Sequence, residues 1–252
     1  MSDMEIKNAA QPFDAAHTAA PFTQKELWDF FHESPHSTSK HILILYSLAV
    51  GMNAQAILDL GLGATTRVLR MATARTGGVV SSCDADIQRF SHLLQQQDDH
   101  WRLFLCASEK LLSTAVGPFD LVVHDAAHDY YQVKMDLDLI LPQMRTFGMI
   151  CVHDVQQVDL APAMLAAIQD ATRNWKVSAT LLPFNAGLAI IRIEKGRHPA
   201  ADTHGGLLPD GRFDTALSPV TCSFSGQTNY AGAKASLPYL IRWKLRKLLM
   251  RW

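Results

Sequence analysis

The sequence lacks a cysteine pair of the kind that metals or redox chemistry need, and it lacks a long hydrophobic run. Its four cysteines include no C-x-x-C pair, which makes a structural zinc or a thioredoxin-type site a poor explanation of the chain. The longest apolar run, Ile42–Val50, is shorter than the roughly 20 residues that cross a bilayer. The first residues hold Asp3, Glu5 and Lys7 but no apolar run, so no signal peptide is expected. These absences predict a reduced, cytoplasmic location.

Charge of either sign is also scarce. Charged residues make up 19% of the chain and the formal net charge is −1, so the basic surplus of a general nucleic-acid binder is missing. The exception is residues 238–252, which carry five lysines and arginines and no acid. Apolar residues recur there at helical spacing, which predicts a basic amphipathic helix. Such a helix would lie on an anionic membrane, on a partner such as the second subunit of a homodimer, or on its own domain.

What the sequence does contain is a regular alternation of apolar β-rich runs and helical stretches, with 48% hydrophobic residues to build a core. A helical stretch separates each of the first six runs, as is typical of a parallel sheet covered on both faces. Only residues 183–187 separate the last two runs, too few for a crossover, so these strands should be antiparallel. The expected strands are 56–60, 79–83, 102–106, 119–124, 149–153, 176–181 and 188–193. The fold class is therefore α/β, a Rossmann-like doubly wound seven-stranded sheet with the last strand antiparallel.

The regions outside this alternation divide the chain into three parts. Residues 1–22 show no clear period and are expected to form a loose arm. The central domain, 23–195, opens with two helices, the first of which begins at a capping box formed by Thr23 and Glu26. Residues 196–252 are rich in glycine, proline and small polar residues before the basic helix, and we expect an irregular C-terminal extension.

A ligand site is expected where the first strands end, because a doubly wound sheet binds ligands beyond the carboxyl ends of its strands. Gly61 and Gly63 follow the first strand, and Asp84 follows the second at the interval from which a carboxylate reaches ribose hydroxyls. The third glycine of a dinucleotide motif is replaced by Thr66, which weakens that interpretation. Asp59 would lie poorly beside a pyrophosphate and suits a cofactor with a cationic sulfonium or an amino group. A tight strand-to-helix turn without a ligand would use the same glycines.

These residues resemble the class I S-adenosylmethionine-dependent methyltransferases. Leu58–Gly63 resembles the first motif of that family, and Asp84 its ribose-binding acid. Phe119–Tyr130 and Gly148–Asp154 are similar to the small-molecule O-methyltransferases that include sugar and macrolide-glycoside enzymes, whose fourth strand ends in D-x-x-H and whose fifth ends in an H-D or E-D pair. The resemblance covers roughly residues 40–193.

The resemblance implies S-adenosylmethionine as the cofactor. The residues that it places at this cofactor are Asp59, Gly61, Gly63 and Asp84, with Ala107 and Ser108 near the adenine. The chain departs from the family pattern at Thr65, where a glycine is frequent, and at Ala107-Ser108, where an acid is common. It departs again at His153, which stands where the E-D pair has its glutamate.

Two histidines and two aspartates supply the candidate chemistry. Asp125 and His128 follow the fourth strand, and His153 and Asp154 end the fifth. Asp125 and Asp154, together with His153, would hold a divalent cation, Mg²⁺ or Mn²⁺, that chelates two oxygens of a vicinal diol. His128 would act as general base on the acceptor, assisted by Asp125. Alternatively, the acids only cap the following helices and His153 only pairs with Asp154.

The remaining histidines are expected to be structural. His124 is expected to have a structural role, because its neighbour Asp125 points elsewhere. Ordinary surface or helix-end positions are expected for the other five, His32, His36, His41, His92 and His100.

The sequence thus predicts an enzyme, an S-adenosylmethionine-dependent O-methyltransferase acting on a hydroxyl of a small molecule such as a sugar or glycosylated metabolite, with help from a divalent cation. The alternatives are a metal-independent N-methyltransferase and an inactive S-adenosylmethionine-binding scaffold, with a dinucleotide oxidoreductase as a distant fourth. The expected partner is the small-molecule acceptor, and no nucleic acid is expected.

Overall fold

The computed structural model describes residues 19–114 and 117–195. The predictions for residues 1–18 of the arm and for the extension 196–252 with its basic helix lie outside the described residues.

Residues 19–22, the end of the expected arm, are packed rather than loose, because Ala19 and Phe22 are 3% and 4% exposed. The guanidinium of Arg67 lies 4.0 Å from the centre of the Phe22 ring, and Arg70 donates to the carbonyl oxygen of Ala19 at 2.5 Å. Arginines of the first crossover helix thus hold this segment on the domain.

A seven-stranded sheet forms the centre of the domain, with strand order β3-β2-β1-β4-β5-β7-β6. Strands β1 to β5 pair in parallel, and β7 pairs antiparallel with both β5 and β6. The predicted fold class is confirmed, including the antiparallel last strand. The strands are β1 Ala56–Leu60, β2 Val79–Asp84, β3 Trp101–Leu105, β4 Phe119–His124, β5 Met144–His153, β6 Lys176–Leu182 and β7 Leu188–Lys195.

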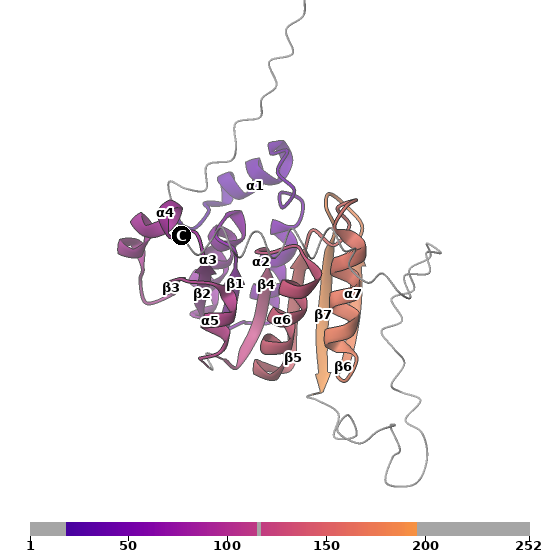
Figure 1. The fold of residues 1–252 in the computed structure, drawn as a ribbon. Coiled ribbons are helices and arrows are strands. Elements are labelled where there is room, and N and C mark those ends of the chain that lie inside the picture. Colours follow the sequence, from indigo (N-terminus) through magenta and orange to yellow (C-terminus); the bar gives the residue numbers. More distant parts are fainter. Residues whose placement is uncertain (1–18, 115–116, 196–252) are drawn as a thin grey trace, which may run out of the picture.

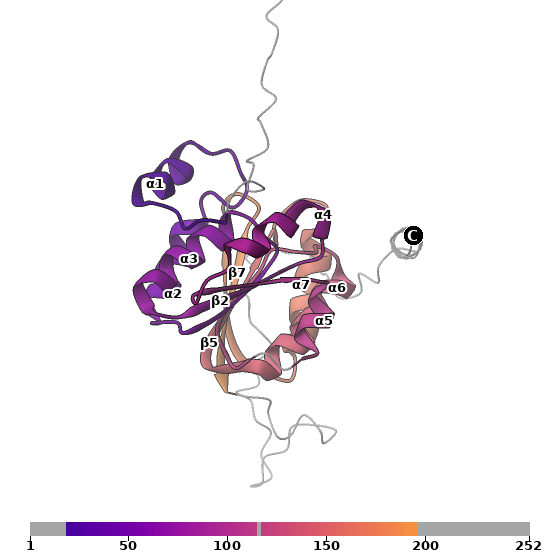
Figure 2. The ribbon, with the colours of Figure 1, turned by 90° about the vertical axis from the view of Figure 1, so that its left-hand side faces the viewer.

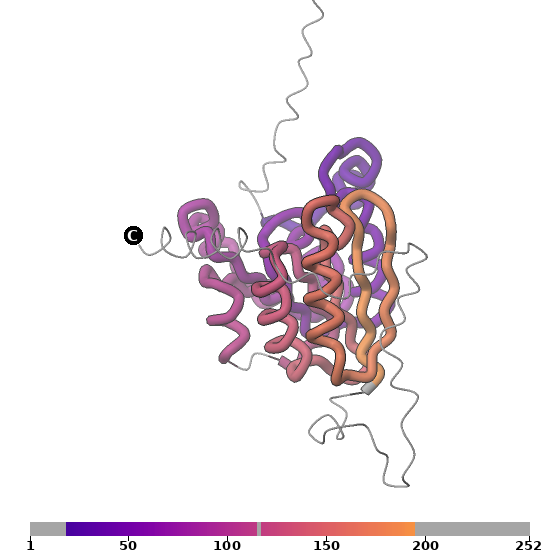
Figure 3. The backbone as a smooth tube through the Cα atoms, turned by 45° about the vertical axis from the view of Figure 1, so that its right-hand side comes forward, coloured from indigo at the N-terminus to yellow at the C-terminus, as the bar shows by residue number. Residues whose placement is uncertain are grey.

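Helices cover both faces of the sheet, as the alternating sequence requires. The α-helices are α1 Gln24–Glu33, α2 Ile42–Gly51, α3 Ala64–Thr76, α4 Ile87–Phe90, α5 Ser108–Leu112, α6 Tyr130–Ile140 and α7 Ala161–Thr172. Figure 2 places α2 and α3 on one side of the sheet and α5, α6 and α7 on the other. Figure 3 shows the latter three side by side, in magenta to salmon, in front of the strands. No helix within the described ranges is long and apolar enough to span a bilayer.

Side-chain alternation along β1 decides what each helical layer meets. Ile57 belongs to the core shared with α2 and α3, whereas Leu58 and Leu60 belong to the core under α5, α6 and α7. Asp59, which alternates with Leu58 and Leu60, therefore faces α3. By the same alternation, the side chains of His124 and Val123 point to opposite faces of the sheet at the end of β4. So do those of His153 and Val152 at the end of β5.

Two elements differ from the expected pattern. The helical stretch expected between the second and third strands is a single α-turn, α4, followed by a 3-10 helix over Ser91–Gln96. Strand β5 begins five residues early, at Met144, with an irregularity in its pairing to β4. The early part carries exposed Arg145 and Thr146 and a left-handed Phe147 at φ 66°, so it shows no period-two alternation from which a strand is predicted.

The carboxyl ends of β1, β2, β4 and β5 meet at one edge of the sheet. In Figure 1 this is the upper edge, opposite the direction in which the arrow of β7 points, and α1 lies above it. The capping box expected at α1 is present, because the N–H of Thr23 donates to Glu26 Oε2 at 2.8 Å and the N–H of Glu26 donates to Thr23 Oγ1 at 3.2 Å. All the predicted site residues lie in β1 or in the strand ends and loops of this edge.

Candidate functional site

The turn after β1 brings the two predicted halves of the site into contact. Gly61 has a φ of 101°, and a Cβ there would collide with the carbonyl oxygen of Asp125. Only glycine adopts this backbone conformation at so close an approach. The N–H of Asp125 in turn donates to the carbonyl oxygen of Leu60 at 2.8 Å. The cofactor-type turn and the segment carrying Asp125 are therefore fixed against each other through their backbones.

Gly63 differs from Gly61, because a Cβ at Gly63 would meet no protein atom within 4 Å. The protein's own packing does not require glycine here, so the small residue leaves open space beside the start of α3. Backbone N–H groups at a helix start favour a ligand that approaches closely. A bound cofactor fits this open space.

Asp59 lies beneath the turn and has no exposed surface. Its Oδ2 accepts hydrogen bonds from Thr66 Oγ1 at 2.6 Å and Ser82 Oγ at 2.9 Å. Thr66 Oγ1 also accepts from the N–H of Gly63 at 3.1 Å. The threonine at the third-glycine position thus links Asp59 to the turn.

Burial raises the pKa of Asp59 from 3.8 to about 7, although the hydroxyls of Thr66 and Ser82 act in the opposite direction. Because the folded pKa lies above the unfolded one, wild-type folding loses stability as the pH rises from about 4 to about 7, at about 1.4 kcal/mol per pH unit at most. Asp59→Asn cannot titrate, so its stability relative to wild type should rise over that window and level off above it. Urea denaturation of both proteins at pH 4.5, 6 and 8 measures this difference, and a constant difference would contradict the assignment.

Asp84 ends β2 beside the same turn. Its Oδ2 accepts from the N–H of Leu62 at 3.0 Å, and its Oδ1 accepts from the N–H of Asp86 at 2.8 Å. Each carboxylate oxygen has a further lone pair. Asp84 is therefore held next to Gly61 and Gly63 with acceptor capacity left for a ligand.

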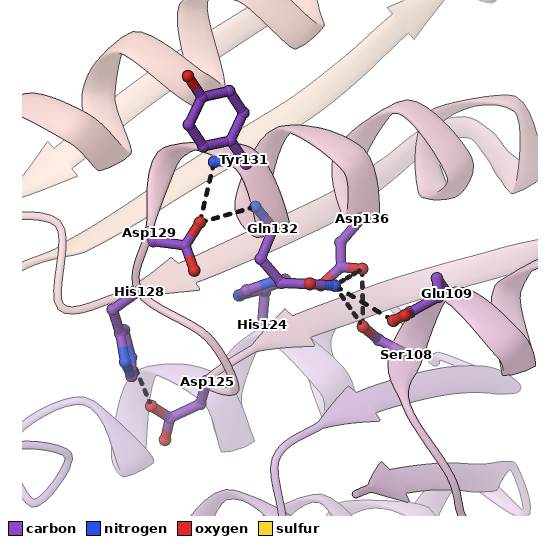
Figure 4. Close-up of polar contacts among 9 residues, drawn as sticks. All are labelled: Ser108, Glu109, His124, Asp125, His128, Asp129, Tyr131, Gln132 and Asp136. Carbon is purple, nitrogen blue, oxygen red and sulfur yellow. Dashed lines mark hydrogen bonds and ion pairs between the residues drawn. The ribbon is translucent and has the colours of Figure 1, made fainter. Parts of the chain in front are cut away.

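Ala107 and Ser108 follow β3 and begin α5. The Ser108 hydroxyl donates to Asp136 Oδ1 at 2.7 Å, and Gln132 Nε2 donates to the same oxygen at 3.0 Å. His124 Nε2 lies 3.0 Å from the other oxygen of Asp136. Figure 4 shows this network under α6, apart from Asp125 and His128. Alternation turns His124 with Val122 toward α6, where it pairs with buried Asp136, a placement that agrees with the structural role expected for it.

The second half of the site gathers the four residues predicted at the ends of β4 and β5. His128 Nε2 lies 3.2 Å from Asp154 Oδ2 and 3.8 Å from Asp125 Oδ1. His153 Nδ1 lies 2.8 Å from Asp154 Oδ1 and 3.1 Å from Asp125 Oδ1. Ligand atoms of Asp125, His128 and Asp154 all lie within 4.8 Å of one another. Residues separated in sequence thus form one cluster, which we call the Asp–His cluster: Asp125, His128, His153 and Asp154.

The electrostatics of the cluster keep the carboxylate of Asp125 charged. Burial acts to raise the pKa of Asp125, but contacts with His128 and His153 outweigh it and hold that pKa below its usual range. Burial acts to lower the pKa of His153, and the contacts with Asp125 and Asp154 instead raise it to about 10. Asp154 has a left-handed φ of 60°, a strained conformation of the kind often found at functional sites.

His41 belongs to the surroundings of this cluster. It lies at the N-terminal end of α2, one of the two positions expected for it, but it has no exposed surface, and its ring stands edge-on to His153 with centroids 4.9 Å apart. His41 Nε2 lies 3.0 Å from the carbonyl oxygen of Phe184 in the β6–β7 turn. Burial and nearby His153 lower the pKa of His41 to about 4. A histidine just before an apolar helix carries no signal for this contact, whereas the other four histidines are exposed as expected.

Residues 58–155 match the family model described as a methyltransferase domain. They form a methyltransferase domain. The match begins just before the Gly61 turn and ends just after Asp154, so it contains Asp84 and the Asp–His cluster. The matched domain and the strand order of the sheet support an enzyme of the class I S-adenosylmethionine-dependent methyltransferase type, as the resemblance implied. No curated protein matches the sequence significantly.

Solved structures of methyltransferases share the fold of this domain. A Staphylococcus aureus protein assigned as a caffeoyl-CoA O-methyltransferase is 14% identical, with 61% of this chain and 83% of that chain covered and a TM-score of 0.53. A Podospora anserina methyltransferase with bound S-adenosylhomocysteine is 18% identical, with 72% and 88% covered and a TM-score of 0.52. A Bacillus cereus O-methyltransferase in complex with S-adenosylhomocysteine is 18% identical, with 61% and 80% covered and a TM-score of 0.50. At these identities the likeness establishes the fold.

Proposed function

We propose that this methyltransferase transfers the methyl group of S-adenosylmethionine to a hydroxyl of a small molecule. The observation that supports this most strongly is the backbone contact between Gly61 and Asp125. It sets the cofactor turn directly beside a cluster that carries a base and two carboxylates. Methyl transfer from a sulfonium is an in-line displacement, so the cofactor and the group that activates the acceptor must be neighbours.

The cofactor would lie over the turn after β1. Gly61 and Gly63 would let it approach the backbone, Asp84 would accept hydrogen bonds from its ribose, and Ala107 and Ser108 would flank its adenine. The open space at Gly63 and the two backbone contacts that orient Asp84 support this placement. Asp59 would hold the turn from below through Thr66.

His128 would serve as the general base. It is 26% exposed on its side chain, so a substrate reaches it, whereas His153 is 2% exposed. Its Nε2 faces Asp154 and Asp125, so an N–H there would be directed at carboxylates and Nδ1 would be left to accept the hydroxyl proton. The same carboxylates stabilise the imidazolium that results.

Asp125 and Asp154, with His153, would hold a divalent cation beside the base. Within the proposed donor set, both ring nitrogens of His153 and Asp154 Oδ1 are buried without a hydrogen-bond partner in the described part of the chain, and these atoms support such an ion. When bound, a divalent cation lowers the pKa of a coordinated hydroxyl and fixes the acceptor's position. A sugar or glycosylated metabolite with vicinal hydroxyls has the oxygens for this, so we propose that acceptor class.

Replacing Asp84 tests the cofactor placement. Asp84→Ala should weaken S-adenosylhomocysteine binding by about 1–3 kcal/mol, the scale of charged hydrogen bonds lost in a partly buried site. Isothermal titration calorimetry of both proteins measures the effect. Asp99→Ala, an exposed aspartate before β3 at the opposite edge of the sheet, is the matched control and should bind normally. Unchanged affinity in Asp84→Ala would remove Asp84 from the ribose site and leave Asp86 as the next candidate.

The class of acceptor atom separates O-methylation from N-methylation. Incubating the enzyme with S-adenosylmethionine and matched pairs of acceptors, such as a vicinal diol and the corresponding diamine, and measuring release of S-adenosylhomocysteine tests the proposal. Turnover of diols and none of diamines is expected. Preferential turnover of amines, with no dependence on added cation, would favour the metal-independent N-methyltransferase. Cofactor binding without turnover of any acceptor would favour the inactive scaffold.

A further inference from the structure

His153 is the least exposed member of the Asp–His cluster, and its ring nitrogens are unusual. The residue is 2% exposed, and neither Nδ1 nor Nε2 has a hydrogen-bond partner among the described residues. Nδ1 nevertheless lies 2.8 Å from Asp154 Oδ1 and 3.1 Å from Asp125 Oδ1. The carboxylate oxygens are therefore close to the nitrogen but outside the directions in which a hydrogen bond forms. A buried polar group left in this state is costly unless something else satisfies it.

The spacing of the donor atoms suits a metal ion between them. Ligands about 2.0–2.2 Å from one ion lie about 3.0 Å apart at right angles and about 3.4 Å apart in a tetrahedron. The distances from His153 Nδ1 to the two carboxylates, 2.8 and 3.1 Å, lie close to the right-angle spacing. An ion bound by all three donors would lie to one side of each line that joins His153 Nδ1 to a carboxylate oxygen. This position explains why the nitrogen–oxygen distances are short although no hydrogen bond forms.

The surroundings of His153 hold its ring in one orientation. It ends β5 on the face opposite Val152, and its ring packs edge-on against His41. His41 is itself fixed by the carbonyl oxygen of Phe184, and Asn185 Nδ2 of the same turn donates to the carbonyl oxygen of Ser37 at 2.9 Å. The loop before α2 and the β6–β7 turn thus hold His41 in place against the His153 imidazole. This packing against His41 restricts the rotation of the His153 ring.

We propose that the cluster binds a first-row transition-metal ion through His153 Nδ1 together with Asp125 and Asp154, in preference to Mg²⁺. The inference rests on the cation site of the proposed function and adds the ligating atom of His153 and the class of ion. Imidazole nitrogen favours ions such as Fe²⁺, Co²⁺ and Zn²⁺, whereas Mg²⁺ selects oxygen donors. His128 also lies within reach, with its ligand atom within 4.8 Å of those of Asp125 and Asp154, but we assign it the role of base and take the nitrogen donor from His153.

Metal binding to chelator-treated protein tests the preference without an activity assay. Titration calorimetry with CoCl₂ and with MgCl₂ should give a Co²⁺ dissociation constant at least about tenfold below that of Mg²⁺. Pulsed electron paramagnetic resonance of the Mn²⁺-loaded wild type should show coupling to an imidazole nitrogen. Equal or tighter Mg²⁺ binding, or a bound Mn²⁺ with no nitrogen coupling, would overturn the inference.

Three variants assign the nitrogen to its residue. His153→Glu, which makes all three donors oxygens, should lose the nitrogen coupling and most of the preference for Co²⁺. His128→Ala should keep both, and loss of the coupling in that variant would make His128 the ligand and contradict the assignment. His92→Gln, an exposed histidine outside the cluster, is the control. The wild-type resonance measurement decides the matter even if His153→Glu fails to fold.

Calorimetry with S-adenosylhomocysteine on the same preparation separates the two proposals. A protein that binds S-adenosylhomocysteine but shows no preference for Co²⁺ refutes the inference about the ion and leaves the methyltransferase function in place. A protein that binds Co²⁺ through nitrogen but no S-adenosylhomocysteine refutes the proposed function instead.

Discussion

Replacing His128 with alanine is expected to lower the rate of methyl transfer by about 10²–10⁴-fold, the usual contribution of a general base. The imidazole is partly exposed beside Asp154 and Asp125, so it reaches the acceptor while the carboxylates stabilise its charged form. S-adenosylhomocysteine affinity should stay nearly unchanged, because the base acts on the acceptor and not on the cofactor. The rate is measured as release of S-adenosylhomocysteine with the vicinal diol that wild type converts fastest.

His92→Gln is the matched control for this variant, since it removes an exposed imidazole from the 3-10 helix far along the chain from the cluster. It should keep wild-type turnover. Full activity in His128→Ala would remove the base from the account and leave proximity and alignment of the cofactor and the acceptor as the source of catalysis.

Removing divalent cations should have an effect of similar size. We expect EDTA to abolish turnover, because Asp125 and Asp154 would then face each other and the acceptor without the ion that neutralises them and orients the hydroxyls. Added Co²⁺ or Mn²⁺ should restore more activity than Mg²⁺ if His153 contributes a nitrogen donor. Asp154→Asn should mimic the loss of the ion and resist rescue. Full activity in EDTA would eliminate the cation and leave His128 as a base that works alone.

The sheet was predictable because its signals are local. Apolar runs separated by helical stretches indicate parallel strands, and the five residues between β6 and β7 leave no room for a crossover. The early start of β5 was not predictable, since Arg145 and Thr146 are exposed and break the alternation. The short α4 was missed because the sequence over 87–97 has helical spacing, while the chain in fact tightens into a 3-10 helix after Phe90.

The part of the candidate site that lies at the ends of strands was predictable from the sequence. Topology alone brings Asp125 and Asp154 to one edge, since β4 and β5 are parallel neighbours. The roles of Asp59 and His41 were not visible, because both depend on burial. Asp59 turns inward to Thr66 and Ser82, and His41 meets His153 in a ring contact between the start of α2 and the end of β5. Contacts between a loop and a distant strand produce no periodic pattern of residues from which they could be predicted.

Binding of S-adenosylhomocysteine to the purified chain tests the central claim most directly. Isothermal titration calorimetry with S-adenosylhomocysteine and, separately, with NAD uses the same protein and the same site. The account predicts saturable binding of S-adenosylhomocysteine, weakened in Asp84→Ala, and no binding of NAD. Tight binding of NAD with none of S-adenosylhomocysteine would contradict it and would assign the turn after β1 to a dinucleotide.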